Sequence, residues 1–314
     1  MDTPVSLRAR ALRELLAAPG MAIAPGAYDA MGARLIEQAG FSVCYMTGAG
    51  TAAAHGYPDF GLLDMTEMVA NAARMAAAIS IPLVADADTG YGNELNVTRT
   101  VREYEARGVA GIHIEDQVAP KRCGHLDGKE VLPTAAFVSK ISAAVQARRT
   151  REFFVIARTD ARAVNGIDDA IARANAALAA GADMAFVEAA QSVEEVAAIP
   201  RRVQGPCLLN VVPNGKTPVI DLREAQAMGY KLAILPGLLL KAAVEAADAA
   251  LAYVKANHLP PIPKMSPAQG FRRFGADEWE ALRKRFDAGA PMSAGAASGD
   301  APAPARQPAG TAAS

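Results

Sequence analysis

The chain has 314 residues, of which 51% are hydrophobic and 21% are charged, and its formal net charge is −1. Such a chain can bury a large core, and its scattered basic residues offer no positive stripe for nucleic acid or an anionic membrane. Its apolar segments are too short or too often interrupted by charge for a signal peptide or a membrane-spanning helix, so we expect a cytoplasmic protein.

A repeated unit runs along the chain, in which an Ala-rich helical pattern ends in Gly and a short apolar run follows. The clearest cases are centred on Gly40, Gly108, Gly181 and Gly229. Glycine just past a helix end permits the left-handed turn that stops the helix. Each unit therefore predicts a helix, a tight loop and a strand.

The apolar runs predict eight strands in chain order, near residues 21–24, 43–46, 83–86, 111–115, 154–158, 184–188, 207–210 and 232–235. The intervening segments have the apolar periodicity of helices, at residues 30–39, 66–79, 96–107, 134–149, 168–180, 193–203, 221–228 and 241–257. Regular alternation predicts a parallel sheet covered by helices. Eight units predict a closed (β/α)₈ barrel, with a doubly wound open sheet as the alternative.

Three regions follow from this pattern. The barrel is expected to occupy residues 1–258, a helical extension residues 259–287 and a tail residues 288–314. The extension contains the only tryptophan, Trp279, and we expect it to dock on the barrel or on a neighbouring subunit. The tail consists largely of Ala, Pro, Gly and Ser, which cannot bury enough surface to become ordered, so it is expected to be disordered.

Polar residues stand at the ends of six predicted strands. Helix N-capping would explain any one of them, but not all six. In a barrel of this kind, catalytic groups come from the C-terminal strand ends and the loops that follow. An active site is therefore predicted at residues 45–48, 86–88, 115–116, 158–160, 188 and 210.

Three of these residues, Asp86, Asp88 and Glu115, offer only oxygen ligands, and no cysteine or histidine stands beside the first two. Such hard ligands favour Mg²⁺, with Mn²⁺ possible. Gly90 and Gly92 allow the backbone to approach a ligand closely. A metal site is therefore predicted after the third and fourth strands.

The loop at residues 116–133 is long for a strand-to-helix connection, which predicts a lid or a binding role. It contains Cys123 among Lys121, Arg122 and His125. Basic neighbours are expected to lower the pKa of this thiol and to make it a proton donor or nucleophile. Cys44 and Cys207 fall within predicted strands and are assigned to the core, and no disulfide is predicted.

Arg158 stands at the end of the fifth predicted strand. It is either an ion-pair partner for Asp160 or Glu188, or a ligand for a substrate carboxylate, and we favour the second. Its planar guanidinium can bind a carboxylate through two parallel hydrogen bonds. It would also offset the negative charge of the neighbouring strand ends.

The motifs ADADTGYGN, HIEDQ, KRCGH and ARTDA resemble those of the isocitrate lyase/phosphoenolpyruvate mutase superfamily, over residues 11–286. Within it the chain is most similar to short lyases of the 2-methylisocitrate and 2,3-dimethylmalate type. The resemblance implies a (β/α)₈ barrel, a small-molecule carboxylate substrate, Mg²⁺, and a homotetramer with exchanged C-terminal helices. It implies that Asp86 binds Mg²⁺ directly while Asp59, Asp88 and Glu115 hold its waters.

The resemblance also implies roles around the substrate. Cys123 is the acid that protonates the departing carbanion, which separates the lyases from the mutases. The general base is either Tyr45 or a metal-ordered water. His125, Lys121 and Arg158 are further catalytic candidates. The implied substrate contacts are the backbone of Thr47, Gly48 and Ala49, with Asp59, Gly124, His125, Arg158, Glu188 and Asn210.

The implied reaction cleaves a 2-hydroxy di- or tricarboxylate to pyruvate or glyoxylate and a second acid. Similar methylisocitrate lyases continue after the seventh strand as NxTEFG, whereas this chain reads NVVPNGKTP from Asn210. The missing acid counts against 2-methylisocitrate, and a smaller substrate, such as 2,3-dimethylmalate or citramalate, fits at least as well. The alternatives are a phosphonomutase, an oxaloacetate decarboxylase or hydrolase, and a non-catalytic barrel that binds dicarboxylates or scaffolds an oligomer.

Overall fold

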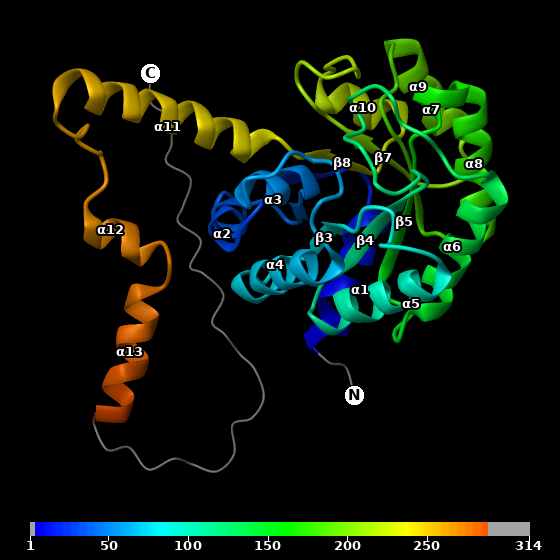
Figure 1. Cartoon of the computed structure of the whole chain (residues 1–314). Helices are drawn as coiled ribbons and strands as arrows, with labels where there is room; N and C mark the ends of the chain where they lie inside the picture. The colour runs from blue at the N-terminus through cyan, green and yellow to red at the C-terminus, as the bar shows by residue number, and fades with distance from the viewer. Residues whose placement is uncertain (1–3, 288–314) are drawn as a thin grey trace. The chain divides into compact units, whose positions relative to one another are not determined.

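The computed structural model, which describes residues 4–287, contains a closed barrel of eight parallel strands (Figure 1). Each strand pairs with the next, and β8 returns to β1, with Leu232 opposite Ala22. The predicted (β/α)₈ barrel is confirmed, and the open sheet is excluded. The strands are β1 (Ala22–Ala27), β2 (Cys44–Met46), β3 (Leu83–Asp86), β4 (Gly111–Glu115), β5 (Phe154–Thr159), β6 (Met184–Val187), β7 (Cys207–Asn210) and β8 (Leu232–Leu235).

Helices surround the strands (Figure 1). Three of them, α1, α3 and α7, are additional to the helices that the sequence predicts. The helices of the barrel unit are α1 (Pro4–Ala17), α2 (Ala30–Gln38), α3 (Gly48–Ala54), α4 (Met65–Ala78), α5 (Glu94–Ala106), α6 (Thr134–Ala147), α7 (Arg162–Asn165), α8 (Ile167–Ala179), α9 (Val193–Arg202), α10 (Leu222–Met228) and α11 (Leu238–Asn257).

The core has two layers because successive strand residues face opposite sides. Val84 belongs to the cluster that fills the barrel, together with Ile156 and Phe186. Its neighbour Ala85 belongs to the cluster between strands and helices. Leu12 of α1 packs with the interior cluster. Cys44 and Cys207 are buried, as their strand positions predict.

α1 is anchored by ionic contacts to the starts of β5 and β6. Arg13 donates to the backbone oxygens of Glu152 and Phe153 and to Asp183. Asp183 also accepts from Arg148 at 2.8 Å and from the Val155 amide at 2.8 Å. One carboxylate thus ties α1, the end of α6 and two strands together.

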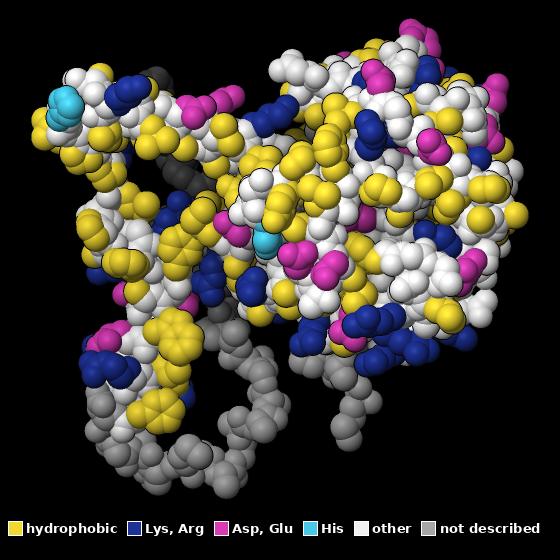
Figure 2. Space-filling model, in the orientation of Figure 1, with side chains coloured by type: hydrophobic (Ala, Val, Ile, Leu, Met, Phe, Trp, Pro, Cys, Tyr) yellow, Lys and Arg dark blue, Asp and Glu magenta, His cyan; other side chains and the backbone are white. Residues whose placement is uncertain are grey.

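The eighth barrel helix departs from its predicted role. α11 begins at Leu238, and Leu239 packs on the core, but no residue of this helix is buried. Val244 is 51% exposed and Leu251 is 69% exposed. Figure 2 shows hydrophobic side chains at the surface of this helix. The apolar periodicity that predicted a covering helix therefore marks a face that the described part of the barrel unit leaves open.

A second compact unit begins at Ile262, and its described part contains α12 (Pro267–Arg272) and α13 (Ala276–Asp287). Trp279 on α13 is exposed within this unit. The tail predicted for residues 288–314 lies outside the described residues. Among residues 4–287 we find no helix with the length and apolar character to cross a membrane.

Replacing Asp183 with Ala should lower the free energy of unfolding by about 3 kcal/mol, because two arginines and a strand amide lose their shared acceptor. Chemical denaturation of the two proteins measures this difference. Asp168→Ala is the matched control, because its pair with Arg202 is exposed and should contribute less than about 1 kcal/mol. Equal effects of the two substitutions would contradict the anchoring role of Asp183.

Candidate active site

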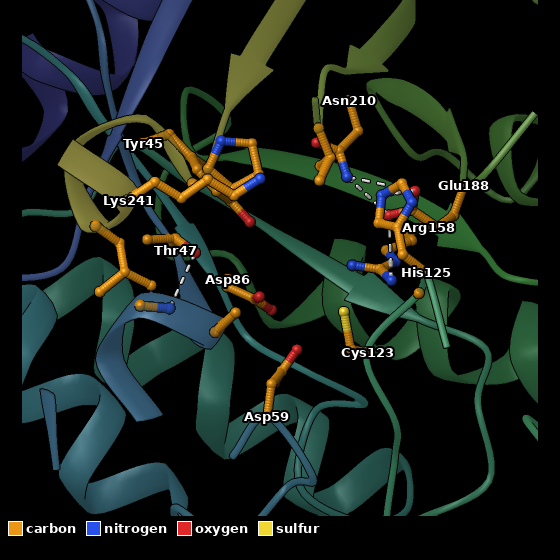
Figure 3. Close-up of a pocket in the computed structure, with 17 residues that line it drawn as sticks. Tyr45, Thr47, Asp59, Asp86, Cys123, His125, Arg158, Glu188, Asn210 and Lys241 are labelled. Atoms are coloured by element: carbon orange, nitrogen blue, oxygen red, sulfur yellow. Dashed lines mark hydrogen bonds and ion pairs between the residues drawn. The ribbon is translucent and has the colours of Figure 1, made fainter. Parts of the chain in front are cut away.

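A cavity of about 190 Å³ lies at the C-terminal ends of the strands (Figure 3). Most of the predicted site residues meet there, while Gly48, Asp88, Glu115 and Lys121 are not part of its lining. The lining residues are Tyr45, Thr47, Ala49, Gly50, Asp59, Asp86, Cys123, Gly124, His125, Arg158, Glu188, Asn210, Val212, Pro236, Gly237, Leu240 and Lys241.

Asp86 occupies the end of β3 and is held by two backbone amides. Its Oδ1 accepts from the Asp88 amide at 2.9 Å, and its Oδ2 accepts from the Gly48 amide at 3.2 Å. A side chain at position 48 would overlap the Asp86 carboxylate, so glycine is required for this contact. Thr47 caps α3 by accepting from the Gly50 amide. The backbone N–H groups of Gly48 and Gly50 therefore already donate hydrogen bonds to oxygens of the protein, those of Asp86 and Thr47.

Lys121 reaches from the loop at residues 116–133 to two of the predicted metal carboxylates. Its ammonium lies 2.5 Å from Asp59 and 2.8 Å from Asp88. Burial alone would lower the pKa of Lys121, but Asp88 and the neighbouring carboxylates raise it well above its usual value. The side chain stays charged and is occupied by these ion pairs.

Arg158 lies at the centre of three carboxylates, Glu115 at 3.1 Å, Asp160 at 2.9 Å and Glu188 at 3.2 Å. The ion-pair role that we weighed against substrate binding is therefore present, and Arg158 also lines the cavity. The two roles are compatible, because a guanidinium has five N–H donors.

Cys123 differs from its prediction. Burial raises the pKa of this thiol, whereas basic neighbours were expected to lower it. The reason is that the Lys121 ammonium is directed to Asp59 and Asp88 rather than to the sulfur. Figure 3 shows the sulfur directed into the cavity. Cys123 is thus a protonated thiol at neutral pH, which suits a proton donor better than a nucleophile.

Glu188 and Asn210 lie side by side in the wall of the cavity. The Asn210 amide donates to both oxygens of Glu188, at 3.3 and 3.0 Å, and the Ala189 amide donates to one of them at 2.8 Å. The His125 ring lies with Nε2 3.4 Å from Glu188. Burial lowers the pKa of His125, so its ring is neutral at physiological pH.

Tyr45 projects into the barrel and contacts a residue that the sequence analysis did not assign to the site. Its hydroxyl lies 2.8 Å from His113 Nε2. Burial raises the pKa of Tyr45 well above its usual value and lowers that of His113 to about 3. Both groups are therefore neutral at physiological pH, and Tyr45 keeps its proton. His113 is the first residue of the HIEDQ motif. A single histidine within an apolar strand predicts a buried core residue, so the sequence did not mark it as part of the site.

The fit of these residues to a magnesium ion can be tested on the contacts of their oxygens. Among the described residues no three Asp, Glu, His or Cys side chains converge as a direct ligand set. However, Glu115 Oε1 is buried with neither a hydrogen bond nor an ion pair in the described part of the chain, while Asp88 Oδ1 faces Lys121 at 2.8 Å and Glu115 Oε2 faces Arg158 at 3.1 Å. Mg²⁺ keeps several waters and binds few protein ligands directly. One direct carboxylate, with others that hold waters, fits this arrangement.

The sequence analysis also missed the apolar side of the cavity. Val212 follows β7, and Pro236 follows β8. Leu240 and Lys241 lie in the first turn of α11. The eighth predicted strand ends without a polar residue, so no chemical signal marked it. Its place in the repeat, as the last strand beside the first, was the available signal.

Three comparisons with known proteins bear on this site. The sequence model of the family described as phosphoenolpyruvate phosphomutase matches residues 12–255. A 2,3-dimethylmalate lyase of Eubacterium barkeri is 50% identical over 226 residues, which cover 72% of this chain and 78% of that protein. A 2-methylisocitrate lyase of Aeropyrum pernix is 42% identical over 240 residues, covering 76% and 77%. The structure of an oxaloacetate acetylhydrolase with 3,3-difluorooxalacetate is similar at a TM-score of 0.86 and 38% identity, covering 92% and 99%.

The pKa of Cys123 can be read from the pH dependence of alkylation. Because burial favours the thiol over the thiolate, iodoacetamide should modify Cys123 more slowly than free cysteine at pH 7, and the rate should rise only at alkaline pH. Mass spectrometry of peptides gives the rate at each cysteine. Burial raises the pKa of Cys44 and Cys207 to about 12, so these two should not compete. Rapid alkylation of Cys123 at pH 7 would contradict a protonated thiol.

Proposed function

The chain belongs to the phosphoenolpyruvate phosphomutase family, and we propose that it is a magnesium-dependent carbon–carbon lyase. Its substrate is a 2-hydroxy dicarboxylate, which it cleaves to pyruvate and a second carboxylic acid. Two relatives named as lyases, at 50% and 42% identity, support lyase chemistry. The observation that carries the proposal is the protonated Cys123 thiol, which lines the same cavity as Asp86 and Arg158.

The acidic residues would hold the metal. Asp86 is the direct ligand in this proposal, and Asp59, Asp88 and Glu115 hold its waters. When bound, Mg²⁺ would supply a Lewis acid that polarises oxygens of the substrate. Glu115 fits this role because its buried Oε1 has neither a hydrogen bond nor an ion pair among the described residues, and Asp88 fits it as a buried carboxylate two residues from Asp86.

The remaining side chains orient the substrate and handle protons. Arg158 and Asn210 donate hydrogen bonds to carboxylate oxygens. The Tyr45 hydroxyl keeps its proton, so we assign it as a hydrogen-bond donor to the 2-oxygen rather than as the base. A base takes the 2-hydroxyl proton, the C2–C3 bond breaks, and its electron pair moves to C3. Cys123 then gives its proton to C3 and becomes a thiolate.

The apolar side of the cavity supports a substrate with small alkyl substituents. Val212, Pro236 and Leu240 line it, and the segment after β7 lacks the acid found in similar methylisocitrate lyases. Methyl groups gain from such a surface, whereas a third carboxylate loses hydration there. We therefore propose 2,3-dimethylmalate or citramalate in preference to 2-methylisocitrate.

A coupled pyruvate assay over a panel of 2-hydroxy acids tests this function. Pyruvate should appear from 2,3-dimethylmalate or citramalate with Mg²⁺, and removal of the metal by a chelator should abolish it. Cys123→Ser should lower kcat by about 100-fold or more, the usual contribution of a positioned acid. Cys207→Ser is the matched control, because this buried residue lies outside the cavity.

Two outcomes of the same assays would contradict the lyase proposal. Phosphonate formation seen by ³¹P NMR, without cleavage of any hydroxy acid, would indicate a mutase. Oxalate or carbon dioxide release from oxaloacetate that survives Cys123→Ser would favour a hydrolase or decarboxylase. The oxaloacetate assay is included because the chain is similar in structure to an oxaloacetate acetylhydrolase.

We also propose that the chain is a cytoplasmic homotetramer that exchanges its C-terminal helices. The support lies in α11, whose exposed apolar residues Val244, Leu251 and Val254 fall on one face of the helix. A 20-residue helix with no buried residue needs a covering surface to be stable in water. A second copy of the chain supplies such a surface.

Light scattering on the purified chain should give a mass about four times the 32.6 kDa of one chain. Leu251→Asp should shift the protein to smaller species, because a charge would enter the covered apolar face. Ala246→Asp carries the same charge on the opposite face of α11 and should have the smaller effect. A wild-type protein that is monomeric at micromolar concentration would overturn the proposal.

A further inference from the structure

The segment after β7, residues 211–217, packs tightly against the His125 ring. The backbone amide of Lys216 donates to His125 Nδ1 at 3.0 Å. A Cβ at Gly215 would lie 2.7 Å from Nδ1 and 2.9 Å from Cε1 of the same ring. Gly215 has no positive φ, so glycine is needed here for space rather than for backbone conformation. The segment and the ring are therefore fitted to each other.

The contact fixes where the ring carries its proton. A backbone amide can only donate, so the Nδ1 atom that accepts from it is unprotonated. A neutral imidazole then carries its proton on Nε2. The position of Glu188 leads to the same assignment independently, because its carboxylate lies 3.4 Å from Nε2 and would repel a lone pair there.

The protonated nitrogen lies beside Glu188, in a ring that lines the cavity. Nε2 is buried and has no hydrogen-bond partner among the described residues. His125 lines the cavity together with Arg158 and Asn210, the two donors that we assign to substrate carboxylates. The Glu188 carboxylate, 3.4 Å away, forms no hydrogen bond with Nε2, so this donor is suited to an oxygen of the bound molecule.

We propose that Gly215 and the Lys216 amide are positioning groups of the active site. They hold His125 as the neutral Nε2–H tautomer, so that it donates a hydrogen bond to a carboxylate oxygen of the substrate and does not act as the base. The nature of the bound molecule rests on the proposed function, while the tautomer does not.

The backbone of this segment carries the effect, and the Lys216 side chain does not. Its ammonium pairs with Asp127 at 2.5 Å, but Asp127 is 96% exposed. Exposed ion pairs contribute little to stability. Asp127→Asn therefore removes this pair while it leaves the amide contact with His125 in place, and it serves as the matched control.

The first test reads the tautomer directly. The full chain has four histidines, so ¹⁵N-histidine labelling gives a small set of signals, and His125→Gln identifies those of His125. With Mg²⁺ at neutral pH, Nδ1 should show the shift of an unprotonated ring nitrogen and Nε2 that of a protonated one. The reverse pattern, or a charged ring, would overturn the proposal.

The second test removes the close fit. Gly215→Ala should raise KM for the cleaved hydroxy acid about tenfold, with a smaller effect on kcat, because one hydrogen bond to a charged group is lost. It should also mix the two tautomers in the ¹⁵N spectrum. Asp127→Asn should leave KM and the spectrum unchanged. An unchanged KM for Gly215→Ala would contradict the proposal.

A further comparison separates positioning from general damage, because the new Cβ would also lie 2.9 Å from the Val212 oxygen. His125→Gln keeps an N–H donor near the position of Nε2. His125→Asn keeps its side-chain amide only near the position of Nδ1, so it should retain less activity than His125→Gln. In the His125→Gln background, Gly215→Ala should add little to KM. An effect of the same size in both backgrounds would show that Gly215 acts on the fold instead.

The two proposals can fail separately. If no hydroxy acid releases pyruvate but the ¹⁵N pattern is as expected, the lyase proposal fails and the positioning of His125 stands. If pyruvate is released but Nδ1 carries the proton, the positioning proposal fails alone.

Discussion

The site depends on one constraint, which is the burial of several carboxylates at one end of a barrel. Buried carboxylates are costly unless cations or strong donors face them. Lys121, Lys129 and Arg158 supply the cations, and all three are themselves buried. Two of the three come from the loop at residues 116–133, so this loop is part of the charge balance of the barrel mouth. The carboxylates they face are Asp59, Asp88, Glu115, Asp160 and Glu188.

This charge balance decides the chemistry of the loop. Because Lys121 is directed to Asp59 and Asp88, its charge does not stabilise a thiolate at Cys123. Lys129 pairs with Asp160 and donates to the Gly124 oxygen, which fixes the backbone next to the same thiol. The loop thus holds Cys123 at the cavity while it keeps the sulfur protonated. An acid that must give a proton to a carbanion needs both properties.

The sequence predicted the barrel well because its signals are local. A Gly-terminated helix followed by an apolar run recurs along the chain, and the predicted β3, β4, β7 and β8 agree with the observed bounds. The strand-end residues were found for the same reason. The pKa of Cys123 was predicted wrongly because burial raises it, and because Asp59 and Asp88, which lie far from the loop in sequence, engage the Lys121 ammonium. Likewise, the periodicity of residues 241–257 shows an apolar face but not what covers it.

The start of α11 links the cavity to the surface of the chain. Leu239 packs on the core, Leu240 and Lys241 line the cavity, and the exposed apolar face begins three residues later at Val244. Lys241 also donates to the Pro213 oxygen at 2.8 Å, in the segment that positions His125. A surface that covers α11 would therefore also restrain one wall of the cavity and, through Pro213, the segment that contacts the ring. Assembly and substrate recognition would then meet at the start of one helix, which explains why an active site can require a helix that has no buried residue.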